Sequence, residues 1–219
     1  MEDDWSYIIL FNKRRLGDNM YNDVIKEMEK YAIDNSVPIM QKRSMTFLCN
    51  FIKKNNIKKI LEIGTAIGYS AINMALVDED IKVISIERDQ EKYIEAIKNV
   101  KKCNLDKRVS LILSDALTIE LQDKYDMIFI DAAKGQYLNF FNKYKDNLNE
   151  EGFIVSDNIE FHGYVENYKK IENRNLRQLV GKLIKYIDFL KENEEYTTKF
   201  YKVGDGLAIT CKKGEEINE

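Results

Sequence analysis

The sequence predicts an α/β fold built on a mainly parallel sheet, and three features of its pattern support this prediction. Short apolar runs alternate with amphipathic stretches between residues 59 and 190. These runs are apolar along their whole length, which is typical of parallel strands buried on both faces. Near the end, two further strand-like runs flank a Gly204-Asp205-Gly206 turn. Such a short glycine-rich turn joins a hairpin, so at least one strand is antiparallel.

The composition is that of a single globular domain over residues 1–219. Hydrophobic residues make up 44% of the chain and aromatic residues 11%, which is enough for a core and argues against disorder. The formal net charge is -3 with both signs interspersed, which excludes a broadly basic nucleic-acid binder but allows a local basic patch. A single histidine argues against a zinc site of His and Cys ligands.

The sequence favours a cytoplasmic protein. Its start, Met1-Glu2-Asp3-Asp4, is acidic and lacks the basic region of a signal peptide. No apolar run approaches the ~18 residues of a membrane span, so no membrane association is expected. The three cysteines are widely spaced and odd in number, so we expect reduced thiols.

Residues 1–55 are predicted to form an N-terminal helical segment, and residues 56–219 the α/β core. Apolar residues spaced three and four apart predict a helix over Met20–Ile33. A second helix is expected to start near Pro38, because proline suits the first turn of a helix. The predicted buried face of this second helix carries Met45, Leu48, Cys49 and Ile52.

The core alternates strands with helices, as expected for connected strand-helix-strand units. The helix Glu91–Cys103 is expected to turn Ile94, Ile97 and Val100 inward. Ligands of open parallel sheets bind at the carboxyl ends of the strands, so the residues that follow each strand are candidates for a site. The predicted strands are Lys59–Ile63, Lys82–Ile86, Val109–Leu113, Asp126–Ile130, Gly152–Ser156, Thr197–Val203 and Leu207–Lys212, and the other helices are Tyr69–Val77, Tyr137–Leu148 and Ile171–Leu190.

The end of the first predicted strand indicates a nucleoside-type ligand. Gly64 and Gly68 allow a tight turn and a close approach of the backbone to a ligand. Glu87 ends the next strand, 87 − 64 = 23 residues after Gly64, where nucleotide-binding α/β folds place the acid that binds ribose hydroxyls. The middle glycine of a dinucleotide fingerprint is absent, which favours a ligand with ribose but no pyrophosphate. The alternative interpretation is a simple packing turn.

The ends of the fourth and fifth strands carry a set of hard oxygen ligands. Asp131 follows one strand, with Lys134 three residues later, and Asp157 and Asn158 end the next. Two carboxylates and an amide oxygen suit Mg²⁺, Mn²⁺ or Ca²⁺. The alternatives are a helix cap at Asp131 and an ordinary turn at Asp157 and Asn158.

These motifs resemble two nested groups of enzymes. Glu62-x-Gly64-x-x-x-Gly68, Glu87 and Ser114-Asp115-Ala116 resemble the class I S-adenosylmethionine (SAM)-dependent methyltransferases. That resemblance implies a Rossmann-like, seven-stranded, mainly parallel sheet with an antiparallel terminal strand. The second set resembles the metal-dependent O-methyltransferases that include the catechol and caffeoyl-CoA enzymes. The resemblance implies Lys134 and Asp131 as catalytic residues, Lys134 being the base, and Asp131, Asp157 and Asn158 as ligands of Mg²⁺ or another divalent cation.

The same resemblance implies which residues contact the cofactor. It also implies a homodimer. The implied cofactor-contacting residues are Met40, Glu62, Gly64, Gly68, Ser70, Glu87, Asp115, Ala116 and Asp131.

The acceptor is suggested by charge and by a closer resemblance. Residues 162–185 carry six basic and two acidic side chains, and Lys13-Arg14-Arg15 forms a second basic cluster. Basic patches of this kind contact phosphates, although a solvated helix face is the alternative. The runs 61–71, 130–137 and 203–209 are similar to bacterial tRNA 5-hydroxyuridine methyltransferases, which make 5-methoxyuridine at the anticodon wobble position. This implies tRNA as the partner, and the tentative substrate contacts are Arg174, Arg177 and Lys182.

Other functions remain open at this point. A catechol-like or hydroxycinnamoyl small molecule also offers two adjacent oxygens, and the basic segment could serve a phosphate-rich acyl-CoA. A non-catalytic module that binds SAM and RNA is a different class of function, disfavoured by the presence of Asp131, Lys134, Asp157 and Asn158 together. An NAD-dependent dehydrogenase is disfavoured by the missing glycine. His162 could touch the substrate or simply be exposed.

Overall fold

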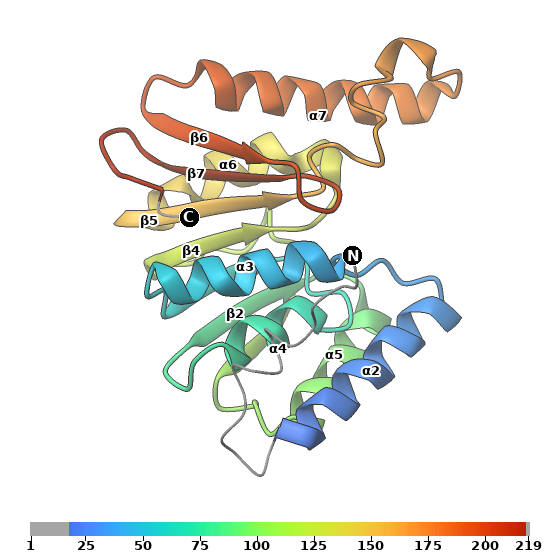
Figure 1. Ribbon diagram of the computed structural model, residues 1–219, viewed down its shortest axis with the longest axis vertical. Coiled ribbons are helices and arrows are strands. Elements are labelled where there is room, and N and C mark those ends of the chain that lie inside the picture. Colours follow the sequence, from blue (N-terminus) through green and yellow to red (C-terminus); the bar gives the residue numbers. More distant parts are fainter. Residues whose placement is uncertain (1–17, 218–219) are drawn as a thin grey trace, which may run out of the picture.

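A computed structural model describes residues 18–217, and these form helices packed around one twisted sheet (Figure 1). The predicted basic cluster at residues 13–15 lies outside the described residues. The helices are α2 (Asp18–Asp34), α3 (Lys42–Lys54), α4 (Tyr69–Leu76), α5 (Gln90–Lys102), α6 (Tyr137–Tyr144) and α7 (Arg174–Glu192), with short 3₁₀ turns η1 (Lys134–Gln136), η2 (Lys145–Asn147) and η3 (Tyr168–Lys170). The strands are β1 (Lys59–Ile63), β2 (Lys82–Glu87), β3 (Val109–Leu113), β4 (Tyr125–Ile130), β5 (Leu148–Asp157), β6 (Tyr196–Tyr201) and β7 (Leu207–Lys212).

The sheet has seven strands in the order β3-β2-β1-β4-β5-β7-β6. Strands β1 to β5 pair in parallel, and β7 pairs antiparallel with both β5 and β6. The prediction of a mainly parallel sheet with an antiparallel terminal strand is therefore confirmed. The strand order reverses at β1, so the carboxyl ends of β1 and β4 are neighbours, which is where open α/β sheets bind ligands.

Helices cover both faces of the sheet, which explains why the strands are apolar throughout. In β4, Met127 and Phe129 pack into one core with residues of α2, α3, α4 and α5. Ile128 and Ile130 point the other way, into a second core with α6 and α7. Figure 1 places α3, α4 and α5 on the near side of the sheet and α6 behind it. None of the helices between residues 18 and 217 combines the length and apolarity needed to cross a bilayer.

Four boundaries differ by three or more residues from those predicted. Strand β5 begins at Leu148 rather than at Gly152. Helix α3 begins at Lys42 rather than near Pro38, with Gln41 in an extended conformation at its N-cap. Helix α6 ends at Tyr144, because a 3₁₀ turn leads directly into β5 at Leu148. Helix α7 begins at Arg174, where the side chain of Asn173 caps it by accepting from the Leu176 amide.

One predicted core residue is exposed. Ile94 is 45% exposed, and α5 instead buries Ala96, Asn99 and Val100. Small Ala96 lets the turn at Gly68 approach α5, since a Cβ built at Gly68 would lie 3.4 Å from the Ala96 methyl. Asn99 donates to the carbonyl of Ile67 in the same turn. Helix α5 therefore turns Ala96 and Asn99 toward the turn at Gly68, and the larger Ile94 is left exposed.

Gly64 allows the ends of β1 and β4 to lie together. Its φ is +102°, and a Cβ added there would lie 2.1 Å from the carbonyl oxygen of Asp131. The amide of Asp131 donates to the carbonyl of Ile63, which holds the two strand ends in register. Any side chain at position 64 would force these ends apart.

We expect Gly64→Ala to destabilise the protein more than Gly214→Ala. Gly214 has the same φ of +102° but nothing within 4 Å of its added Cβ. Gly214→Ala should cost about 1 to 2 kcal/mol through backbone conformation alone. Gly64→Ala should add about 1 to 3 kcal/mol because of the collision with Asp131. Urea unfolding measures both, and equal losses would contradict this role of Gly64.

Candidate active site

A cavity of about 750 Å³ opens at the carboxyl ends of β1, β2, β3 and β4. Most of the cofactor-binding, catalytic and metal-binding residues predicted from the sequence line it. Glu62, Gly68 and Asp157 do not line it and lie beneath or beside it. The predicted residues that do line it are Met40, Gly64, Ser70, Glu87, Asp115, Ala116, Asp131, Lys134 and Asn158.

The carboxylate of Glu87, at the end of β2, binds the backbone of the turn that follows β1. One carboxylate oxygen accepts from the amide of Ala66 at 2.8 Å, and the other accepts from the amides of Arg88 and Asp89 at 2.9 Å each. Ala66 is held at a positive φ of 46° by this contact. The carboxylate retains free lone pairs toward the cavity that it lines, so it can also accept from hydroxyl groups of a ligand.

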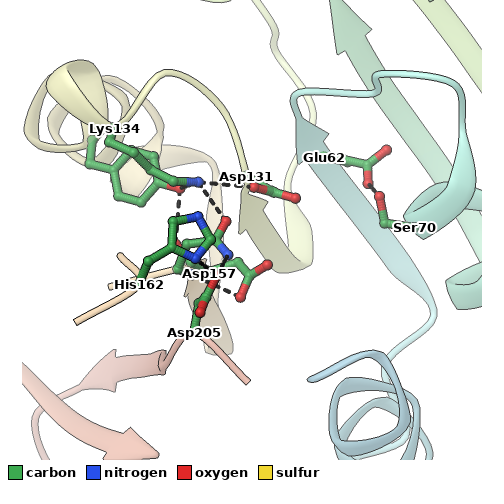
Figure 2. A network of polar contacts seen from close by, with 9 residues as sticks. Glu62, Ser70, Asp131, Lys134, Asp157, His162 and Asp205 are labelled. Atoms are coloured by element: carbon green, nitrogen blue, oxygen red, sulfur yellow. Dashed lines mark hydrogen bonds and ion pairs between the residues drawn. The ribbon is translucent and has the colours of Figure 1, made fainter. Parts of the chain in front are cut away.

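Glu62 is a fully buried carboxyl group beneath the same turn. It accepts hydrogen bonds from the hydroxyl of Ser70 on α4 (Figure 2) and from the hydroxyl of Ser85 on β2. Ser85 in turn contacts the hydroxyl of Thr65 at 2.5 Å. Burial raises the pKa of Glu62 to about 8, and the two serine hydroxyls only partly offset this. The residue therefore links β1, β2 and α4 from below the cavity.

The other predicted cofactor residues lie around the far wall. Asp115 begins the turn after β3, and its carboxylate accepts from the Leu117 amide at 2.8 Å. Ala116 and Met40 are buried and line the cavity. Met40 comes from the extended segment that precedes α3, so the late start of that helix delivers its side chain to the site.

Lys134 lies at the centre of the second half of the cavity. Its ammonium group is 2.6 Å from Oδ1 of Asn158 and 3.3 Å from Oδ1 of Asp131. It also donates to the hydroxyl of Tyr137 at 3.0 Å. Tyr137 is fully buried and donates to the carbonyl of Asp157. Burial, followed by the charges of Asp131 and Asp157, raises the pKa of Tyr137, so this hydroxyl keeps its proton.

Asp157 holds an unpaired oxygen. Its Oδ1 accepts from the amide of Asn158 at 2.8 Å. Its Oδ2 is buried and has no hydrogen-bond partner among residues 18–217. Burial and the charge of Asp131 raise the pKa of Asp157. A buried carboxylate oxygen without a partner is costly unless a cation or a proton joins it.

The residues present fit a divalent cation. Asp131, Asp157 and Asn158 follow neighbouring parallel strands, and two of their oxygens already face one ammonium group. The free oxygen of Asp157 and the hard-oxygen chemistry suit Mg²⁺ or Mn²⁺, with positions left for water and an acceptor. Among the described residues, no three His, Cys, Asp or Glu side chains are grouped so that they could hold a metal ion.

Two polar residues here were not predicted. Tyr137 lies three residues after Lys134. That spacing on a helical turn could have indicated the contact between the Lys134 ammonium and the Tyr137 hydroxyl. Asp205 sits in the hairpin turn and is only 12% exposed. It pairs with His162 at 2.8 Å, and both residues line the cavity (Figure 2). Hairpin contacts of this kind join distant parts of the chain and leave no local pattern.

The basic residues are exposed beside this half of the cavity. Lys182 packs its stem over Gly135, next to Lys134. Arg174 is exposed at the start of α7. Arg177 is exposed as well, but its guanidinium donates to the carbonyl of Ile171, which gives it a local structural contact. Leu179 of the same helix lines the cavity.

We expect the stability contributed by Glu62 to fall as pH rises. Because burial raises its pKa to about 8 from an ordinary 4.5, the folded protein binds this proton more tightly than the unfolded chain. The stabilisation is complete below the unfolded value and is lost as pH rises through the folded one. Glu62→Gln cannot lose a proton. The unfolding free energy of the wild type, relative to that of Glu62→Gln, should drop by at least about 1 kcal/mol between about pH 5 and pH 8.5.

Urea unfolding at the two pH values measures this difference, with exposed Glu194→Gln as the control. Parallel pH profiles for the wild type and Glu62→Gln would show that Glu62 stays charged in the folded protein.

The chain is similar to known O-methyltransferases. The O-methyltransferase family model matches residues 18–213. A flavonoid 3',5'-methyltransferase of Vitis vinifera is 27% identical over 198 residues, covering 85% of this chain and 82% of the relative. A caffeoyl-CoA O-methyltransferase of Stellaria longipes is 28% identical over 152 residues, covering 64% of this chain and 63% of the relative.

Solved structures share the fold. A Staphylococcus aureus "putative caffeoyl-CoA O-methyltransferase" aligns with a TM-score of 0.83 and 35% identity, covering 94% of this chain and 98% of that one. A Bacillus cereus O-methyltransferase solved in complex with SAH aligns with a TM-score of 0.75 and 21% identity, covering 87% and 91%. The predicted Rossmann-like methyltransferase fold is thereby confirmed. Since the family model spans residues 18–213, this protein belongs to the O-methyltransferase family.

Proposed function

We propose that this enzyme transfers a methyl group from SAM to one of two adjacent oxygens on a planar acceptor, with the help of a divalent cation. The observation that carries the proposal is one cavity with two different ends. One end has the glycine turn, Glu87 and Asp115. The other has Asp131, Lys134 and Asn158, next to the unpaired oxygen of Asp157.

The first end suits a ribose-bearing cofactor. Structural neighbours with this fold were solved with SAH or SAM, including the Bacillus cereus enzyme and TomG from Streptomyces achromogenes. In this chain Glu87 would accept from the ribose hydroxyls, and Asp115 and Ala116 would flank the adenine. Gly64 also lines this cavity.

The second end suits activation of an acceptor hydroxyl. A bound cation would lower the pKa of that hydroxyl. Lys134 Nζ would take up the proton, and a cation near Asp131 and Asn158 would favour the neutral amine because like charges repel. The acceptor oxygen then attacks the methyl carbon while the carbon–sulfur bond breaks and the electron pair stays on sulfur. Tyr137 holds the amine in place through its hydroxyl.

For the acceptor, the chain's own surface favours 5-hydroxyuridine in tRNA, whose O5 and O4 oxygens are adjacent. Arg174, Lys182 and Lys185 are exposed on α7, a helix that contributes Leu179 to the cavity and packs on η1 beside Lys134. Clustered cations beside a site are suited to RNA phosphates. The product would be 5-methoxyuridine at the wobble position.

A small molecule is the second candidate, and the comparisons favour it. The relatives' descriptions name caffeoyl-CoA and flavonoid acceptors. A catechol-like ring presents the same pair of oxygens to the same residues. The same exposed cations on α7 would then meet the phosphates of an acyl-CoA or only solvent.

We expect Lys134→Ala to lower methyl transfer by at least about a hundredfold, because general bases contribute that much or more. SAH affinity, measured by calorimetry, should stay within about twofold, since Lys134 lies at the acceptor end. Lys98→Ala, an exposed lysine on α5, is the control. Full turnover of Lys134→Ala at neutral pH would eliminate the base assignment.

The acceptor can be identified by transfer of a labelled methyl group from SAM. Substrates are tRNA carrying 5-hydroxyuridine, the same tRNA without the hydroxyl, and a simple catechol, each with Mg²⁺ and with chelator. Chelator should abolish transfer to whichever acceptor is used. Transfer restricted to hydroxylated tRNA supports the RNA proposal, and transfer restricted to catechol supports the small-molecule candidate.

Charge reversal tests the RNA surface separately. The Arg174→Glu, Lys182→Glu double variant should raise the KM for tRNA about tenfold, because phosphate contacts supply affinity. Transfer to catechol, if present, should not change. Lys191→Glu, at the far end of α7, is the matched control. An unchanged KM for tRNA would remove these two residues from the RNA interface.

A further inference from the structure

The hairpin turn between β6 and β7 is built into the acceptor end of the cavity. The carbonyls of Asp205 and Gly206 accept from the amides of Glu160 and Ile159, at 2.9 and 3.1 Å. A Cβ at Gly206 would lie 2.7 Å from the Glu160 side chain, so the turn cannot carry a larger residue at this position without shifting. These contacts place the Asp205 carboxylate beside the segment that follows Asn158.

Asp205 contacts the side chain of Asn158. Its Oδ2 accepts from Nδ2 of Asn158 at 3.4 Å and lies 2.8 Å from Nδ1 of His162. The other end of the same amide, Oδ1 of Asn158, faces the Lys134 ammonium at 2.6 Å. The backbone of Asn158 has a φ of +54°, a conformation that asparagine tolerates and that directs its amide into this gap.

The charges select one orientation of this amide. If the amide turned over, its oxygen would face the Asp205 carboxylate and its nitrogen would face the Lys134 ammonium. Both contacts would then be repulsive. The contact with Asp205 therefore holds Nδ2 on the side of the hairpin and leaves Oδ1 of Asn158 on the side of Lys134 and Asp131.

We propose that Asp205 is a positioning residue that orients the Asn158 amide oxygen toward a divalent cation held with Asp131 and Asp157. The inference rests on the proposed cation site. Groups that orient metal ligands typically change metal affinity about tenfold to a hundredfold when removed. His162, whose side chain is 63% exposed, contacts the same carboxylate oxygen of Asp205 (Figure 2).

The test is Mn²⁺ binding to the purified protein, followed by the EPR signal of free Mn²⁺. Asp205→Ala should weaken binding at least about tenfold. Asp205→Asn keeps an oxygen that can accept from Asn158, so its loss should be clearly smaller. SAH affinity should stay within about twofold in both variants, because Glu87 and Asp115 bind at the other end of the cavity.

Asp157→Ala separates this inference from the proposed function. If the wild type does not bind Mn²⁺, or binds it no better than Asp157→Ala does, the cation site itself is wrong. If Asp157→Ala loses binding and Asp205→Ala keeps wild-type affinity, only the role of Asp205 is overturned. Equal losses in Asp205→Ala and Asp205→Asn would also overturn it, because charge alone would then account for the effect.

Discussion

The close approach of β1 and β4 at Gly64 is the constraint on which the site depends. The missing side chain lets the turn after β1 rest against the backbone of Asp131. That contact places Gly64, in the turn after β1, next to Asp131, the first of the three residues that would hold a cation. A methyl donor and an acceptor must be held in line and a few ångströms apart, so one short backbone contact sets the distance between the two halves of the reaction.

Several acidic side chains lie close together in the site, each in a different environment. The Glu87 carboxylate accepts hydrogen bonds from backbone amides of the adjoining turns. Glu62 is buried among hydroxyls, and burial raises its pKa to about 8. Asp131 faces Lys134, whereas Asp157 keeps one oxygen without a partner among residues 18–217. Only the last arrangement is incomplete without a cation or a proton, and for that reason it points to chemistry rather than to stability.

The acceptor side is assembled from segments that are far apart in the chain. Lys134 comes from the turn after β4, Asn158 from the end of β5, and Asp205 from the final hairpin. Because β7 pairs with β5, the start of β7 at Leu207 lies opposite Asp157, which brings the preceding turn to the site. The antiparallel strand thus completes the acceptor end of the cavity as well as the sheet.

Much of this could be predicted from the sequence. Apolar runs and helical spacing determined the order of strands and helices, since burial on two faces imposes that pattern locally. The residues after the strands identified Gly64, Glu87, Asp131, Asp157 and Asn158, because parallel strands bring their carboxyl ends to one edge. Spacing did not predict that Ile94 is exposed, that α3 starts late and frees Met40, or that Arg177 binds a backbone carbonyl. Nor did spacing predict that Tyr137 contacts Lys134 and Asp157, or that Asp205 contacts Asn158. Those outcomes depend on which surfaces meet when the sheet twists and the hairpin folds back, and contacts between residues distant in sequence leave no periodic trace in the chain.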